Sequence, residues 1–136
     1  MGTRSAIGVY ENEKVTAVYC HWDGYISHNG KILNDHYNVE KTKQLVALGD
    51  LSSLRPNVVA RCPQQHSFDS PERDVCVFYG RDRGETDVRA NVVDSADQLF
   101  NLYGHCEYFY VIKDNIWYVS EGPGTPWRLL AEEVGR

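Results

Sequence analysis

Two short stretches of the chain combine side chains that can do chemistry. The first is residues 20–25, Cys-His-Trp-Asp-Gly-Tyr. Successive side chains of a strand point to opposite faces, so His21 and Asp23 are expected to share one side. An aspartate that holds an imidazole in one tautomer makes an acid–base pair. The alternative is that Asp23 simply opens a turn and that Trp22 belongs to the core.

The second stretch is residues 78–85, Phe-Tyr-Gly-Arg-Asp-Arg-Gly-Glu, which places Arg81 and Arg83 between two glycines. Guanidinium groups bind phosphate or carboxylate through forked hydrogen bonds, and glycine lets a ligand approach the backbone closely. The alternative is a solvated hairpin turn in which Asp82, Glu85 and Asp87 pair with the arginines. The glycine spacing matches neither a P-loop nor a dinucleotide-binding fingerprint.

Four further residues are of metal-ligand types, Cys62 and His66 in one pair and His105 and Cys106 in another. Structural zinc sites usually show two close ligand pairs with characteristic spacing, and this pattern is only a partial match. We therefore expect no metal and no cofactor. The Gly-x-Ser-x-Gly elbow of the serine hydrolases is also missing, which argues against an ordinary hydrolase.

The overall charge argues against general binding to nucleic acid or to an anionic membrane. The chain has 14 Lys and Arg against 19 Asp and Glu, a formal net charge of -5, so an anion site would have to be local. No apolar run approaches the roughly 20 residues that span a bilayer. The 4 cysteines form no Cys-x-x-Cys pair and follow no secretory signal. We therefore expect reduced thiols and a cytoplasmic location.

Two β-hairpins are predicted by alternating apolar residues on either side of a polar turn. The first spans residues 4–22 and turns at residues 12–13, and the second spans residues 107–120 and turns at residues 114–115. An isolated hairpin is marginally stable at best in water. Both hairpins are therefore expected to belong to one antiparallel sheet.

Two helices are predicted by apolar stripes and capping residues. The first covers residues 39–48, with Asn38 as its N-cap and Gly49 directly after it. The second covers residues 95–103 and begins with the Ser-x-x-Gln pattern of a capping box. Four leucines are expected to be buried in these helices: Leu45, Leu48, Leu99 and Leu102.

The remaining segments contain shorter elements. Residues 32–37 and 127–133 have short helical patterns. Residues 54–73 contain three prolines and are interpreted as a long surface loop. The apolar run at residues 75–79 indicates a central strand, and residues 88–93 are predicted to be its neighbour.

This order of elements indicates a single α+β domain over residues 1–136. Because the strands are grouped in hairpins, the sheet should be mostly antiparallel, with two or three helices packed on one face. Each chemistry-bearing stretch follows a strand that is predicted to be central. We therefore expect Asp23 and Tyr25 to lie at the same end of the sheet as Arg81 and Arg83, in one polar concavity.

Four motifs carry a resemblance: Met-Gly-Thr-Arg-Ser at the start, residues 20–25, Gly-Asp-Leu-Ser-Ser-Leu at residues 49–54, and residues 78–85. In these motifs the chain resembles a family of small uncharacterised proteins of tailed bacteriophages and prophages. The resemblance covers most of the chain and implies a protein made in a bacterial cytoplasm during infection, but no activity. Small phage proteins often bind and redirect a host component, including defence systems.

Three hypotheses from different classes follow. The leading one is a non-enzymatic phage accessory protein that binds a host protein, such as a defence-system component. Its candidate binding residues are Trp22, Asp23, Tyr25, Tyr79, Arg81 and Arg83. The second is a small-ligand binder or sponge for a nucleotide-type signal, with the arginines on phosphate and an aromatic ring against the base. The third is a small acid–base enzyme that uses His21 with Asp23 or Glu85.

Overall fold

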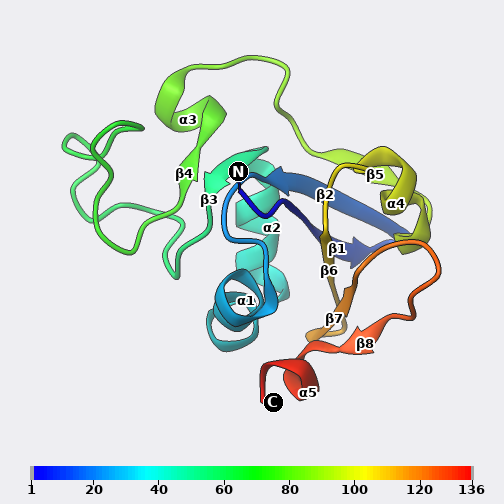
Figure 1. Cartoon of the computed structure of the whole chain (residues 1–136). Helices are drawn as coiled ribbons and strands as arrows, with labels where there is room; N and C mark the ends of the chain where they lie inside the picture. Colours follow the sequence, from blue (N-terminus) through cyan, green and yellow to red (C-terminus); the bar gives the residue numbers. More distant parts are fainter. Residues whose placement is uncertain (1, 136) are drawn as a thin grey trace.

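The computed structural model describes residues 2–135 and shows an α+β fold built on one sheet (Figure 1). The strand order is β4-β3-β2-β1-β6-β7-β8, and β5 pairs separately with β2. The strands are β1 (Ser5–Glu11), β2 (Lys14–Cys20), β3 (Leu51–Ser53), β4 (Val77–Phe78), β5 (Asn91–Val93), β6 (Tyr108–Lys113), β7 (Ile116–Ser120) and β8 (Arg128–Leu129). The helices are η1 (Ile26–Gly30), α1 (Lys31–His36), α2 (Val39–Ala47), α3 (Tyr79–Arg83), η2 (Ala96–Gln98), α4 (Leu99–Leu102) and α5 (Leu130–Val134).

Both predicted hairpins are present, with the predicted turns. In the hairpin of β1 and β2, Asn12 and Glu13 have φ angles of 54° and 63°, as a two-residue hairpin turn requires. In the hairpin of β6 and β7, Ile112 lies opposite Trp117. The hairpins share one sheet, but β1 joins β6 in parallel and β2 joins β3 in parallel. The sheet is therefore mixed, mostly antiparallel with two parallel pairs.

The prediction of a central strand at residues 75–79 is wrong. Strand β4 contains only Val77 and Phe78, and it lies at the edge of the sheet. Its predicted neighbour also lies elsewhere, because β5 pairs with β2. The run is apolar because Val75, Cys76 and Phe78 are buried, and burial does not require a central position in the sheet.

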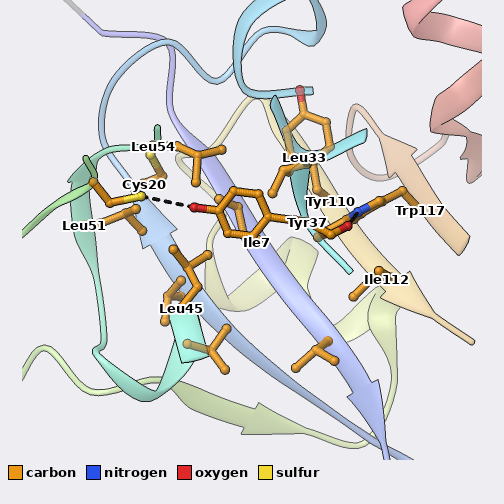
Figure 2. Packing of buried hydrophobic residues seen from close by; sticks show 14 of the residues in the cluster. Ile7, Cys20, Leu33, Tyr37, Leu45, Leu51, Leu54, Tyr110, Ile112 and Trp117 are labelled. Atoms are coloured by element: carbon orange, nitrogen blue, oxygen red, sulfur yellow. Dashed lines mark hydrogen bonds between the residues drawn. The ribbon is translucent and has the colours of Figure 1, made fainter. Parts of the chain in front are cut away.

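The sequence suggested that the helices pack on one face of the sheet, but they pack on both faces. Neighbouring residues of β2 belong to different clusters: Val18 packs in the larger core cluster with residues of α1, α2 and α5, and Ala17 packs in the smaller one with Leu99 of α4. Adjacent strand residues point to opposite faces, so α4 covers the face opposite the other helices. Figure 2 shows Ile7 of β1 surrounded by the side chains of the larger cluster, among them Leu33 and Leu45.

The two longest predicted helical segments lie where the sequence places them. Asn38 caps α2 by accepting a hydrogen bond from the Lys41 N–H at 2.8 Å, and the capping box at η2 is present. Three of the four leucines are buried or partly buried, but Leu102 is 44% exposed, so its predicted burial is wrong. Helix α4 ends at this residue. No helix within residues 2–135 is long and apolar enough to cross a membrane.

Between β3 and β4 the chain forms the long loop that the prolines predicted, drawn in green in Figure 1. The loop is folded on itself. The Glu72 carboxylate accepts the backbone N–H groups of Arg61 and Cys62 at 2.9 and 2.8 Å. Asn57 forms an isolated parallel bridge with Val75, so the two ends of the loop lie together beside β4.

Candidate functional site

The segment after β2, residues 22–30, is held to the body of the protein through its backbone; we call it the Trp22 turn. The Gly24 N–H donates to the Thr3 carbonyl at 2.8 Å, and the Tyr110 hydroxyl donates to the Gly24 carbonyl at 2.6 Å. Only glycine fits at position 24, because a Cβ there would lie 2.8 Å from the Ser5 side chain. These contacts tie the turn to the segment that leads into β1 and to β6.

A fully buried side chain, Asn29, closes the turn from inside. Its Nδ2 donates to the Trp22 carbonyl at 3.1 Å, and its backbone N–H donates to the Asp23 carbonyl at 3.2 Å. The His28 N–H donates to the Tyr25 carbonyl at 3.1 Å. Together with the Gly24 contact, four successive carbonyls of the turn each accept a hydrogen bond, which keeps the backbone in one conformation.

Two aromatic side chains project from this fixed backbone into solvent. Trp22 is 43% exposed and Tyr25 is 38% exposed. The Trp22 ring packs against the backbone of Gly2, where a Cβ would lie 2.7 Å from the ring, and it meets the His21 ring edge-on at a centroid distance of 4.6 Å. The alternative interpretation of the sequence placed Trp22 in the core, but its side chain lies at the surface.

The structure gives His21 and Asp23 different partners. His21 Nδ1 lies 2.6 Å from the Tyr19 hydroxyl, whereas Asp23 lies 4.0 Å from His28 Nε2 and 3.4 Å from the Tyr25 hydroxyl. Asp23 has a φ of 57°, and this left-handed residue ends the strand alternation that would have put the two side chains on one side. His21 and Asp23 therefore do not form the acid–base pair that the sequence suggested.

Burial and the charge of Arg4 lower the pKa of His21, so the neutral ring is favoured there. Burial also raises the pKa of the neighbouring Tyr19 hydroxyl. A hydrogen bond with Arg4 lowers this pKa, but the effect of burial is larger. The Tyr19 ring lies 5.0 Å from the ring of His105. These residues form a polar cluster next to the Trp22 turn that the linear spacing of the sequence did not reveal.

The second predicted site, Arg81 and its neighbours, lies on helix α3 and is engaged within the protein. Arg81 donates to the carbonyl of Cys76 at 2.9 Å, to that of Val58 at 2.5 Å, and to the Asp82 carboxylate at 2.9 Å. Its guanidinium also stacks over Phe78 at 4.7 Å. A phosphate would have to displace several of these contacts.

Arg83 and Glu85 form an ion pair with each other across the Gly84 C-cap. The Arg83 guanidinium stacks over the rings of Phe68 and Tyr79 at 4.5 and 5.2 Å. This is the neutralised arrangement that the sequence offered as the alternative to an anion site. It also leaves Glu85 engaged by an arginine rather than by His21.

The most buried polar contact of this region joins the long loop to α3. His66 Nε2 lies 3.2 Å from the Asp82 carboxylate, and both side chains are 4% exposed. His66 Nδ1 accepts the Glu72 N–H at 3.0 Å, and Asp82 also accepts the Phe78 N–H at 2.8 Å. The pair fastens the loop to the sheet edge. His66 and Asp82 are 16 positions apart, so their spacing in the sequence did not predict this pair.

The two chemistry-bearing stretches leave the sheet in opposite directions. Because β2 is parallel to β3 and β4 is antiparallel to it, the Trp22 N–H reaches the Ser52 carbonyl at 3.0 Å, while the Tyr79 N–H reaches the Asp50 carbonyl at 3.3 Å. The expected pairing of Asp23 with Arg81 or Arg83 is replaced by the separate partners described above. The prediction of one shared polar concavity depended on β4 being central, and that placement is wrong.

Within residues 2–135, no three His, Cys, Asp or Glu side chains are grouped so that they could hold a metal ion. Both ring nitrogens of His66, the one histidine near Cys62 in sequence, already face Glu72 and Asp82.

In comparisons with known proteins, the chain matches no family model, no curated protein and no solved structure. The function must therefore be argued from the site itself.

Proposed function

We propose that this chain is a bacteriophage accessory protein that acts in the bacterial cytoplasm by binding a host protein, such as a component of a defence system. The phage context rests on the sequence resemblance. The binding mode rests on one observation: Trp22 and Tyr25 are exposed on a turn whose backbone is hydrogen-bonded at four successive carbonyls. Exposed Trp and Tyr on a fixed backbone are typical anchors of protein interfaces.

The rigidity of the turn matters for affinity. A loop that must be ordered during association loses conformational entropy, and a loop that is already fixed avoids this cost. The Trp22 turn is held by Thr3 just before β1, by Tyr110 of β6 and by its own buried Asn29. Its two aromatic side chains are therefore presented in one arrangement, which supports tight and selective recognition.

The two other hypotheses have weaker support in this part of the molecule. Arg81 and Arg83 have carboxylate, carbonyl and ring partners inside the chain, which disfavours them as a nucleotide phosphate site. His21 pairs with Tyr19 instead of an aspartate, which disfavours the acid–base mechanism. We therefore assign the candidate anchors to Trp22 and Tyr25, without the arginines.

The test is capture from bacterial lysate with the purified chain as bait, followed by identification of the bound proteins. We expect one host protein in stoichiometric amount, with its capture abolished by Trp22→Ala and strongly reduced by Tyr25→Ala, because interface anchors typically contribute about 2 kcal/mol or more. The matched control is Ile116→Ala, which removes a 47% exposed apolar side chain on β7. Circular dichroism of each variant confirms that it is folded.

The proposal fails if no stoichiometric partner appears at micromolar bait. It also fails if a partner is captured equally well by the wild type and by both folded aromatic variants, because the binding surface would then lie elsewhere.

A further inference from the structure

A groove of about 430 Å³ lies on the face of the sheet that α4 only partly covers. The residues that line it come from β1, β6 and β7, from the chain that leads into η2 and its first residue, and from the segment before β8. A volume of this size is in the usual range for small-molecule sites. The residues that line it are Tyr10, Asp94, Ser95, Ala96, Val111, Lys113, Tyr118 and Trp127.

The aromatic wall of the groove is held in place. The Trp127 ring stacks on Phe100 with a centroid distance of 5.6 Å and an interplanar angle of 16°, and its Nε1 donates to the Asp97 carboxylate at 2.8 Å. Phe100 in turn packs edge-on against the buried Phe109 of β6 at 4.9 Å. Trp127 is therefore positioned by Phe100 and Asp97, neither of which lines the groove, while its own side chain does.

The groove contains one cationic side chain. Lys113 Nζ lies over the Tyr10 ring at 4.6 Å from its centroid, a contact that leaves the ammonium able to donate hydrogen bonds to an anion. The carboxylate of the groove, Asp94, is already paired with Lys14 at 2.5 Å, and this hydrogen bond lowers the pKa of Asp94. The groove therefore offers a ligand three aromatic rings and one available ammonium, while its one carboxylate is ion-paired with Lys14.

We infer that this groove binds a planar aromatic ligand that carries a negatively charged group. The ring of the ligand lies against Trp127, Tyr10 and Tyr118, and its anionic group accepts hydrogen bonds from Lys113. Offset stacking and a charge-assisted hydrogen bond are the interactions that these side chains can offer together. A mononucleotide and an aromatic carboxylic acid share this chemistry. The inference does not depend on the Trp22 turn, whose residues do not line the groove.

The experiment is a titration of the ¹⁵N-labelled full chain, followed by NMR, with two anionic probes and one neutral probe. The anions are 1-naphthoate and AMP, which separate the carboxylic acid source from the nucleotide source, and the neutral probe is 1-naphthalenemethanol. We expect saturable shifts of the amide resonances of Ala96, Lys113 and Tyr118 with at least one of the anions.

Lys113→Met should weaken binding of the anionic probe about fivefold or more and leave the neutral probe unchanged, because the charge-assisted hydrogen bond is lost while the rings remain. Lys31→Met on α1 is the matched control and should change neither affinity. Trp127→Leu should weaken the binding of all three probes. The amide spectrum of this variant shows whether the protein is folded. Either no saturable shift in the groove with both anions, or equal anion affinity in the wild type and Lys113→Met, overturns the inference.

Discussion

Asn29 and Tyr110 are the residues that connect the interior of the protein to its candidate binding surface. Both are fully buried, and both use their polar atoms to hold backbone carbonyls of the Trp22 turn. A buried polar group that lost its partner would be costly, at about 1–3 kcal/mol. These two side chains therefore stabilise the fold and keep Trp22 and Tyr25 in position through the same hydrogen bonds.

At the residue scale, the four thiols are expected to differ in their reactivity. All four cysteines are free, and only Cys62 is exposed. Burial raises the pKa of the Cys20 and Cys106 thiols to about 12 and also raises the pKa of Cys76. Because the thiolate is the reactive form, the native protein should react with Ellman's reagent rapidly at one site.

The remaining thiols should react only after denaturation. Cys62→Ser should remove the fast phase and leave the slow reaction unchanged. A second fast thiol in the native protein would show that one of the three buried cysteines is accessible.

A second prediction at this scale concerns His21 and pH. Its pKa is lowered in the folded protein by burial and by Arg4, so below the ordinary value of about 6.5 the unfolded chain binds more protons than the folded one. The free energy of unfolding should therefore fall as the pH drops from about 7.5 to about 5.5. Tyr19 and Trp22 contact the His21 ring, and the charged group that acts on it is Arg4.

Urea unfolding at the two pH values measures this effect. His21→Gln should show a smaller loss of stability over the same interval, because it does not titrate there. His36→Gln, at the exposed end of α1, is the control and should behave as the wild type does. Identical pH dependence in the wild type and His21→Gln would contradict the prediction.

At the scale of elements, strand direction decides where the motifs lie. The edge strand β4 runs against β3, and β2 runs with it, so the chain leaves β2 and β4 at opposite ends of β3. The segment that leaves α3 then passes Gly49 on its way to β5, and the Asp50 N–H donates to the Val88 carbonyl at 2.7 Å. This crossing brings two backbones into close contact at the end of α2.

The prediction at this scale is that Gly49→Ala is strongly destabilising. Gly49 has a φ of 85°, and a Cβ there would lie 2.3 Å from the Val88 carbonyl oxygen. The left-handed conformation and the collision together should lower the free energy of unfolding by about 2–4 kcal/mol. Denaturant unfolding at constant pH measures the loss.

Gly84→Ala is the matched control. Gly84 has a φ of 74° but nothing within 4 Å of the position of a Cβ, so only the conformational cost of about 1–2 kcal/mol applies. If the two variants lose equal stability, the collision with the Val88 carbonyl adds nothing to the cost of Gly49→Ala, which would contradict the prediction.

At the scale of the whole molecule, one sheet carries a core on each face. Strands β1, β2 and β6 contribute residues to both clusters, so neither cluster can lose its strands without exposing the other. We therefore expect residues 1–136 to unfold as a single cooperative domain.

The measurement is urea unfolding followed both by tryptophan fluorescence, which is sensitive to the buried Trp117, and by far-UV circular dichroism. The two transitions should have the same midpoint and slope. Separate midpoints would show that the α4 side and the α1–α2 side unfold independently, which would contradict a single domain.

Several elements are specified by local interactions and were therefore predictable from the residues alone. The two hairpin turns, the Asn38 cap and the capping box of η2 involve residues within a few positions of one another, so their type and spacing were sufficient to predict them. The exposed aromatics Trp22 and Tyr25 were also identified as candidate anchors, because a tryptophan and a tyrosine beside a glycine turn stand out in the sequence.

Long-range packing sets the strand order, the parallel pairing of β1 with β6, the partner of β5 and the partners of Arg81. Each of these joins segments that are far apart in the chain. An apolar run such as residues 75–79 shows that the segment is buried, and a motif with two arginines shows that it is charged. Neither pattern shows which distant segment makes the contact, because the choice of partner depends on how the whole chain packs around both faces of the sheet.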